Sequence, residues 1–278
     1  MIIKKKRSRS KNKTQDITSP RSNKSFLKNN TKDDKIIVFG RHSCFSILLN
    51  KNRIIHQIFI TKNIEQNFEL FLSNNNLSSN KFKINIVDNK YLDNLVNENN
   101  HQGIVIITNY LKIDSQFSLL KLLNKNQNIK NILILDQITD PHNVGSIIRS
   151  AVAFDFKIII FCSNNSIIEN SIILKTSAGA FEKTSLFIAS NLNDLISKLK
   201  KLDFWCISFS GDGNNKLCDL DNLKKKAVII GSEGRGIRKL VKQNSDFICK
   251  INISSDVESL NVSNACAIAL YQLSNLNQ

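Results

Sequence analysis

The second half of the chain alternates between short apolar runs and longer amphipathic stretches, and this alternation strongly limits the folds open to it. The runs predicted to be strands are 132–135, 157–161, 186–189, 204–209, 227–230 and 247–253. The stretches predicted to be helices are 144–154, 168–177, 192–201, 237–242 and 258–273. Buried strands that alternate with helices are typical of a parallel sheet covered on both faces. Residues 130–278 are therefore predicted to form an α/β domain.

A smaller α/β module is predicted to precede this domain, at residues 35–110. Its predicted strands are 35–39, 57–60, 82–87 and 103–107, and its predicted helices are 44–49, 67–73 and 90–96, with Ser43 capping the first. Residues 111–129 are rich in Leu, Lys and Asn and are predicted to be a linker with one helix at 117–123. A chain of 278 residues is long enough for two such domains.

The charge of the chain is strongly positive, at a formal +16. Residues 1–35 hold 12 of the 39 basic residues but only 3 of the 23 acidic ones. Such an excess indicates a polyanionic partner, most often nucleic acid, although the Lys and Asn usage of an AT-rich genome would also produce it. Residues 1–34 have too little apolar surface to offset the entropy of ordering, so a disordered basic tail is predicted there.

The cysteine spacing and the lengths of the apolar runs indicate the cellular compartment of the protein. No two of the six cysteines form a C-x-x-C pair, and several lie in apolar runs, so they are predicted to be buried free thiols in a reducing compartment. No metal site is predicted, because His42 and Cys44 have no second pair of ligands nearby. No apolar run reaches membrane-spanning length and no secretory core is present, which favours a cytoplasmic protein over one with an organellar transit peptide.

A glycine-rich loop follows the predicted strand at 227–230. Gly231, Gly234 and Gly236 allow a sharp turn and a close approach of the backbone to a ligand, and Glu233 lies at the tip. The loop lacks the Lys-Ser/Thr ending of a P-loop, and strand 132–135 is not followed by G-x-G-x-x-G. These absences count against an ordinary nucleotide-binding protein and leave a ligand loop of another kind.

Two further segments combine polar side chains with a predicted helix. The run Val257-Glu-Ser-Leu-Asn-Val-Ser-Asn264 places four short polar side chains before a helix with a small-residue face, which is more than one cap requires. The run Asp140-Pro-His-Asn-Val-Gly-Ser-Ile-Ile-Arg-Ser150 leads into a helix with a regular apolar face. Asn143 and Arg149 lie off that face, so both are free for other roles.

In chain order, the segment 140–150, the glycine-rich loop and the segment 257–264 resemble the first, second and third motifs of the SpoU (TrmH-like) RNA 2′-O-ribose methyltransferases of the SPOUT class. The resemblance extends over residues 36–278, because the Gly40 turn and the segment 101–105 resemble the substrate-binding domain of that family, which has a fold like ribosomal protein L30e. It implies a knotted parallel-sheet catalytic domain, S-adenosylmethionine as cofactor and RNA as partner. It also implies a homodimer in which each site receives Arg149 from the neighbouring subunit.

The resemblance also assigns roles to residues. It implies that the main chain of Gly231, Ile251 and Leu260 lines the S-adenosylmethionine site, and that the catalytic set is Asn143, Arg149, Glu233, Ser259 and Asn261. A guanidinium stays protonated and is a poor base, so Arg149 is expected to hold a phosphate and stabilise the developing alkoxide. A phosphate or Glu233 would then accept the proton, or Glu233 would orient Arg149 or the substrate.

Plainer interpretations of the same residues stay open. Arg149 suits a solvated helix face, Asn143 suits a helix cap, and Glu233 suits neutralisation of Arg235. Ser259 and Asn261 suit a loop that caps itself. His101 and Gln102 suit a turn before a strand.

The sequence departs from the family pattern in three places. Phe154-Asp-Phe156 replaces an expected Gly, Arg235 stands where close relatives are often acidic, and Asn252 and Ser255 replace a usual Pro and Gly.

The predicted function is S-adenosylmethionine-dependent 2′-O-methylation of RNA, most similar to the bacterial enzymes that modify a guanosine of 23S rRNA. The alternatives are the same reaction on tRNA or another rRNA site, and a catalytically silent RNA-binding protein.

Overall fold

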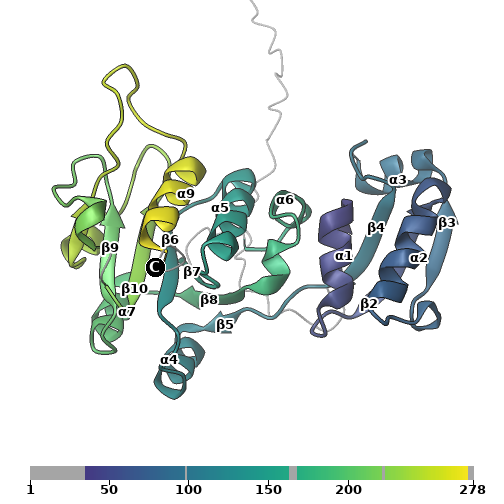
Figure 1. Cartoon of the computed structure of the whole chain (residues 1–278), viewed down its shortest axis with the longest axis horizontal. Coiled ribbons are helices and arrows are strands. Elements are labelled where there is room, and N and C mark those ends of the chain that lie inside the picture. Colours follow the sequence, from purple (N-terminus) through teal and green to yellow (C-terminus); the bar gives the residue numbers. More distant parts are fainter. Residues whose placement is uncertain (1–34, 98, 163–167, 221–222, 275–278) are drawn as a thin grey trace, which may run out of the picture. The chain divides into compact units, whose positions relative to one another are not determined.

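The computed structural model describes residues 35–97, 99–162, 168–220 and 223–274. The tail predicted at 1–34 lies outside these ranges. Within them the chain forms a four-stranded sheet and a seven-stranded sheet, each with its own helices (Figure 1).

The smaller sheet contains residues from the first part of the chain. Its strands are β1 (Lys35–Phe39), β2 (Ile55–Thr61), β3 (Ile84–Val87) and β4 (Ile104–Asn109), in the order β1-β4-β2-β3. Strand β4 is antiparallel to both neighbours, and β2 and β3 are parallel. The helices of this module are α1 (Arg41–Leu49), α2 (Glu65–Asn74) and α3 (Asn89–Val96). Every element predicted here is present, with ends that differ by a few residues.

The start of α1 differs from the prediction. The helix begins after Gly40, whose φ of +91° suits a glycine, and the Arg41 amide donates to Gln102 Oε1 at 2.8 Å. Ser43 lies inside the helix and is buried, and its hydroxyl donates to the Leu174 carbonyl at 2.6 Å. The prediction of Ser43 as the cap was therefore wrong, because its hydroxyl bonds to the larger module. Gln102 does more than form a turn, since its side-chain oxygen accepts a hydrogen bond from the first amide of α1.

The larger sheet is parallel throughout, as the alternating pattern predicted. Its order is β11-β9-β10-β6-β7-β8-β5. The strands are β5 (Asp114–Ser115), β6 (Asn131–Asp136), β7 (Ile158–Cys162), β8 (Ser185–Ala189), β9 (Trp205–Phe209), β10 (Lys226–Gly231) and β11 (Phe247–Cys249). The central strands β10, β6 and β7 are buried along their whole length. Burial on both faces explains why these runs are continuously apolar in the sequence.

Helices cover both faces of this sheet. They are α4 (Gln116–Lys125), α5 (Pro141–Ala153), α6 (Ser171–Thr176), α7 (Leu192–Lys200), α8 (Lys239–Gln243) and α9 (Val262–Leu273). Alternate β6 side chains enter two apolar clusters: Leu133 packs with residues of α5, α6 and α9, and Ile134 packs with residues of α4, α7 and α8. The two clusters form the layers on either side of the sheet.

Three segments differ from the predicted elements. The predicted linker at 111–129 contains β5, which pairs with β8, and α4, whose Leu119 and Leu123 are buried, so it belongs to the layers of the larger sheet. Strand β11 ends at Cys249 rather than at 253. Helix α9 begins at Val262, because the Asn261 side chain accepts from the Ser263 amide and caps it.

A buried ionic cluster joins the two modules. Arg53 Nη1 lies 2.6 Å from Glu169 Oε1, and Arg53 Nη2 lies 2.6 Å from Glu182 Oε1. Arg53 comes from the loop before β2, whereas the two glutamates flank α6. All three side chains are almost completely buried. One apolar cluster also contains residues of both modules, including Ile36 and Leu174. These contacts fix the smaller sheet against α6.

The cysteines are buried free thiols wherever their side chains are described. These are Cys44, Cys162, Cys206, Cys249 and Cys266. Burial raises the pKa of the Cys206 thiol to about 12, and the nearby Asp246 adds to the shift. The side chain of Cys218 lies outside the described part of the chain.

Lys226 makes a testable contribution to stability. It is 1% exposed, and its ammonium donates to the carbonyl of Leu273, the last residue of α9, at 2.7 Å. Replacing Lys226 with methionine removes the donor to a buried carbonyl and is expected to lower the free energy of unfolding by about 1–3 kcal/mol. The exposed Lys224, replaced in the same way, is the control. Equal urea midpoints for the two variants would contradict this assignment.

Candidate active site

The three motifs meet at the carboxyl edge of the large sheet. Strands β6 and β10 are parallel neighbours, and their last residues, Asp136 and Gly231, pair in register. The segment after β6 leads into α5, and the glycine-rich loop follows β10. Parallel α/β sheets bind their ligands at this edge, so the arrangement places the start of α5 and the glycine-rich loop where a site is expected.

Asn143 connects the motifs. Asp140 caps α5 by accepting from the amides of His142 and Asn143, and Pro141 occupies the first helical position. Asn143 therefore lies within the first turn, 8% exposed. Its Nδ2 donates to Glu233 Oε2 at 3.2 Å, and its Oδ1 accepts from Asn261 Nδ2 at 3.0 Å. The interpretation of Asn143 as a helix cap was wrong, because Asp140 is the N-cap residue of α5.

Glu233 and Asn261 both contact Asn143, but only Asn261 also bonds within its own segment. Glu233 is exposed at the loop tip and bonds to Asn143, and no ion pair links it to Arg235 among the residues that the structure describes. Asn261 caps α9 as the plainer interpretation held, and its amide nitrogen also reaches Asn143. Ser259 is exposed, and no side-chain hydrogen bond of Ser259 occurs within the described ranges. The resulting polar cluster is Asn143, Glu233 and Asn261.

The glycine-rich loop folds back on its own strand. The Ser232 amide donates to the Gly236 carbonyl at 3.2 Å, and the Gly236 amide donates to the Ser232 carbonyl at 2.8 Å. A Cβ at Gly231 would lie 2.2 Å from the Gly236 carbonyl carbon, so no side chain fits there. Gly234 and Gly236 have φ values of +82° and +65°, which favour glycine. The fold of the loop itself thus accounts for its glycines.

A buried carboxylate anchors the far end of this loop. Asp136 is completely buried, and it accepts from Arg238 Nε at 2.8 Å and from the Arg238 amide at 3.1 Å. Arg238 Nη2 also donates to Cys162 Sγ at 3.3 Å. Sequence reasoning missed this pair. Its signal was a charged residue at the end of an otherwise apolar strand.

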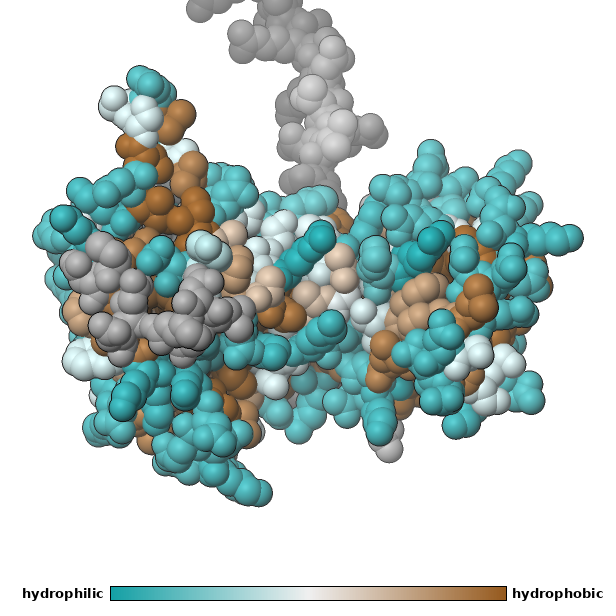
Figure 2. Space-filling view, viewed as in Figure 1, coloured by the Kyte–Doolittle hydropathy of each residue, from teal (hydrophilic) through white to brown (hydrophobic). Residues whose placement is uncertain are grey.

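The groups near the expected cofactor position suit a polar ligand. Gly231 is buried at the end of β10, whereas Ile251 and Leu260 are half-buried in the segment between β11 and α9. Ser232 Oγ is buried and has no hydrogen-bond partner within the described part of the chain. A buried hydroxyl without a partner is costly and is satisfied when a polar ligand arrives. Figure 2 shows apolar side chains on the loop before α9, where Ile253 and Val257 are exposed.

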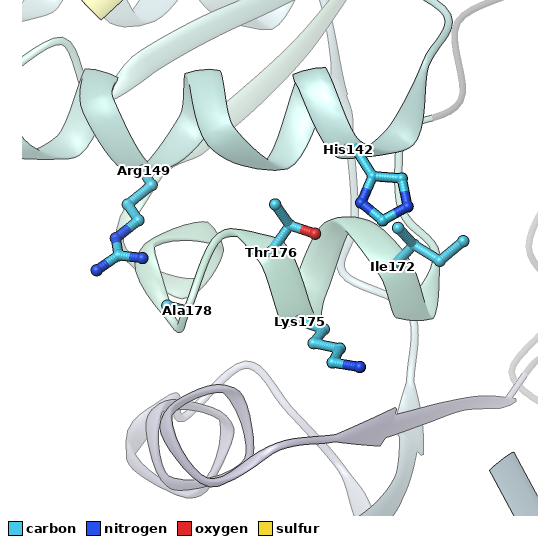
Figure 3. Close-up of a pocket in the computed structure, with 6 residues that line it drawn as sticks. All are labelled: His142, Arg149, Ile172, Lys175, Thr176 and Ala178. Carbon is cyan, nitrogen blue, oxygen red and sulfur yellow. The ribbon is translucent and has the colours of Figure 1, made fainter. Parts of the chain in front are cut away.

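Arg149 lies apart from the polar cluster of its own chain. It follows Asn143 by six residues on α5, which places it about 9 Å further along the helix and on another side of it. Its exposed side chain lines a cleft with His142, Lys175 and Thr176, among others (Figure 3). Within the described contacts, none joins Arg149 to Glu233 or Asn261. One chain therefore unites three of the predicted catalytic residues and leaves Arg149 on a neighbouring face.

Comparison with known proteins identifies the class. The family described as "SpoU rRNA Methylase family" matches residues 130–271, and the one described as "RNA 2'-O ribose methyltransferase substrate binding" matches residues 37–113. With the three motifs joined at the sheet edge, these matches define an S-adenosylmethionine-dependent RNA 2′-O-ribose methyltransferase. The chain belongs to the SpoU rRNA methylase family.

Relatives and solved structures agree with this assignment. A 23S rRNA (guanosine-2′-O-)-methyltransferase RlmB of Coxiella burnetii is 35% identical over 69% of this chain and 76% of its own length. One of the same name from Shewanella oneidensis is 30% identical over 85% and 95%. The fold matches the SpoU methyltransferase AviRb from Streptomyces viridochromogenes, solved with AdoMet, with a TM-score of 0.68 over 86% of this chain and 89% of that one, at 17% identity. The sequence-based predictions of fold, family and reaction are confirmed.

Two other features bear on the sequence-based expectations. Among the described residues, no group of three or more His, Cys, Asp or Glu side chains is placed to hold a metal ion. No helix in the described ranges is long and apolar enough to cross a membrane.

Asn143 provides a direct test of the polar cluster. Asn143→Ala removes both links, to Glu233 and to Asn261, and is expected to lower the methyl-transfer rate by about 10²-fold, as loss of one oriented hydrogen-bonding group does elsewhere. Ser150→Ala, near the other end of α5, is the control and should retain the rate of the unmodified protein. Equal rates for the two variants, measured with RNA in excess, would contradict the role of Asn143.

Proposed function

We propose that this protein methylates the 2′-hydroxyl of a guanosine in 23S rRNA. The joining of Asn143, Glu233 and Asn261 into one polar cluster carries the proposal, because it places an acceptor and two amides at the ligand edge of the sheet. The choice of 23S rRNA follows the names of relatives that are 30–35% identical and that this chain covers over most of their length.

The residues divide the chemistry between them. Arg149 holds a phosphate of the RNA and stabilises negative charge that develops on the ribose oxygen. Glu233, oriented by Asn143, accepts the proton of the 2′-hydroxyl directly or through a phosphate. Asn261 and Ser259 shape the third motif and hydrogen-bond to the substrate. S-adenosylmethionine, when bound, supplies an electrophilic methyl group on its sulfonium.

The cofactor site is proposed to consist of main-chain groups of Gly231, Ile251 and Leu260. The Ser232 hydroxyl, buried without a partner in the described chain, supports a polar ligand beside this loop. The return of the loop at Gly236 packs the main chain of Gly236 against Gly231, the last residue of β10.

The proposed assembly is a homodimer in which Arg149 acts in the site of the neighbouring chain. The separation of Arg149 from Glu233 along α5 supports this, since one chain does not bring them into contact. Helix α9, which packs on α5, also exposes Ile268 and Tyr271. An apolar helix face of this kind suits burial against a second copy.

The dimer is tested by mixing two inactive variants. A heterodimer of Arg149→Ala and Asn143→Ala chains has one intact site and one doubly defective site. An equal mixture that exchanges subunits is therefore expected to recover about a quarter of the full activity. A mixture that forms heterodimers yet stays inactive would contradict the sharing of Arg149 between subunits.

The domain roles are proposed from the same family. Residues 35–110 would form the L30e-like substrate-binding domain, and residues 111–278, which include β5 and α4, the methyltransferase domain. The family matches at residues 37–113 and 130–271 support this division. The enzyme is proposed to work in the cytoplasm, where ribosomal RNA and S-adenosylmethionine are both available. The reaction is proposed to need no metal ion.

The substrate is tested by incubating the protein and labelled S-adenosylmethionine with total RNA from a strain that lacks the gene. The expected product is one labelled 2′-O-methylguanosine in large-subunit rRNA. Label in tRNA or at another rRNA nucleotide would keep the reaction and replace the substrate. Binding of RNA without transfer, also with ribosomal precursor particles, would favour a silent RNA-binding protein.

A further inference from the structure

The glycine-rich loop at 231–238 is attached at both ends to one residue of β6. Gly231, the last residue of β10, pairs in register with Asp136, the last residue of β6. At the other end of the loop, Arg238 returns to the same residue. Its Nε donates to Asp136 Oδ1 at 2.8 Å, and its main-chain amide donates to Asp136 Oδ2 at 3.1 Å. This contact between Asp136 and Arg238, called the latch below, holds the far end of the loop at the sheet.

The latch is enclosed and oriented by its surroundings. Asp136 is 0% exposed, and each of its two oxygens accepts from Arg238. A charge-assisted hydrogen bond in a site without water is strong and directional. The guanidinium also donates from Nη2 to the Sγ of Cys162, the last residue of β7, at 3.3 Å. Because β10, β6 and β7 are neighbours in the sheet (Figure 1), Arg238 is fixed at the ends of adjacent strands.

The composition of the loop makes a restraint of this kind necessary. Gly231, Gly234 and Gly236 all belong to it, and glycine loses more backbone freedom on ordering than any other residue. Among the main-chain hydrogen bonds of the described residues, those inside the loop join only Ser232 and Gly236. A loosely held loop pays an entropic cost when a ligand orders it, whereas a loop that is already held does not. The latch is therefore placed to order the loop before a ligand arrives.

We propose that Asp136 and Arg238 are positioning residues that hold the glycine-rich loop in the conformation that binds S-adenosylmethionine. The inference rests on the proposed function, because the main chain of Gly231 is assigned there to the cofactor. Asp136 is enclosed by protein, so it acts on cofactor binding through the loop rather than by contact. Without the latch, binding must also order the loop, and the affinity falls. Once the cofactor is bound the loop is ordered again, so the rate of transfer at saturation changes less.

The first test replaces Arg238 by methionine in the full chain. Calorimetry should show S-adenosylmethionine binding about tenfold more weakly, which is near the cost of ordering one further side chain. The buried Ile237 still packs in the apolar layer of α8, so the loss is partial. At saturating cofactor and RNA, kcat should fall by a smaller factor than the affinity. Lys239→Met, at the exposed neighbouring position, is the control and should bind the cofactor like the unmodified protein.

A double variant separates positioning from stability. Arg238→Met leaves the buried carboxylate of Asp136 without its cation, which lowers stability. Asp136→Asn/Arg238→Met removes that charge as well and keeps an oxygen opposite the main-chain amide of residue 238. The double variant should therefore have a higher urea midpoint than Arg238→Met. Its affinity for S-adenosylmethionine should stay as weak, because both variants lack the side-chain contact.

Two results would overturn the positioning role. Cofactor affinity that returns together with stability in the double variant would show that the latch serves stability alone. Cofactor binding by Arg238→Met as tight as that of Lys239→Met would show that the loop needs no latch. If Arg238→Met does not fold, the comparison of the double variant with Lys239→Met decides the point. An unmodified protein that binds S-adenosylmethionine but transfers no methyl group would overturn the proposed function instead, and the cofactor affinities would still decide the role of the latch.

Discussion

Replacing Arg149 by alanine is expected to lower the rate of methyl transfer by about 10³-fold at saturating RNA and S-adenosylmethionine. The size follows from losing a charged donor that stabilises an oxyanion in the transition state. The affinity for S-adenosylmethionine should not change, because Arg149 is assigned to an RNA phosphate and the ribose oxygen and not to the cofactor. Rapid-quench measurement of transfer and calorimetric measurement of cofactor binding test the two parts separately.

Arg149→Lys is the matched variant. It keeps the positive charge and loses the planar bidentate geometry, so its rate should fall between those of alanine and arginine. A loss of cofactor affinity in Arg149→Ala would contradict the role assigned here. A lysine variant as fast as the unmodified protein would show that charge alone matters, and the bidentate contact would be wrong.

Replacing Arg53 by methionine is expected to have the largest effect on stability, lowering the free energy of unfolding by about 3–5 kcal/mol at pH 8. The change leaves two buried carboxylates, Glu169 and Glu182, without their cation. Chemical denaturation monitored by far-UV circular dichroism measures the loss. Lys51→Met, at an exposed position two residues away, is the control and should change stability little.

The effect of Arg53→Met should depend on pH in a definite direction. Burial already raises the pKa of Glu169 above its usual value, and Arg53 opposes that shift. Without Arg53 the folded-state pKa rises further, so the folded chain binds more protons than the unfolded chain. Stability then falls as the pH rises from the unfolded pKa through the raised folded pKa. The deficit should be smaller at pH 5 than at pH 8, and a deficit that grows on acidification would contradict this account.

The sequence predicted the larger sheet well, because burial on both faces leaves a continuous apolar run. Strands such as β6 and β10 are of this kind. The prediction failed where a tertiary contact decided the outcome. Strand β5 has two residues, Asp114 and Ser115, and exists only because β8 offers an edge. Ser43 looked like a cap in the sequence, but its partner is the Leu174 carbonyl, 131 residues further along the chain.

In the candidate site too, the sequence indicated individual residues but not the tertiary contacts between them. The motifs indicated Asn143, Glu233 and Asn261 as separate polar residues, and their pairing depends on strand order, which the sequence pattern does not contain. Asp136 and Arg238 were missed because each looks ordinary alone and their contact spans 102 residues. The catalytic roles of Asn143, Arg149, Glu233, Ser259 and Asn261 and the cofactor roles of Gly231, Ile251 and Leu260 stay predictions.

The measurement that tests the central claim most directly is alkaline hydrolysis of RNA labelled by this protein with S-adenosylmethionine. Cleavage by alkali requires a free 2′-hydroxyl, so a 2′-O-methylated nucleotide protects the bond on its 3′ side. The account predicts that the labelled methyl group appears in alkali-resistant dinucleotides, and that Asn143→Ala greatly reduces this label. Label in mononucleotides would show that a base is methylated, and the assignment of 2′-O-methyl transfer would be wrong.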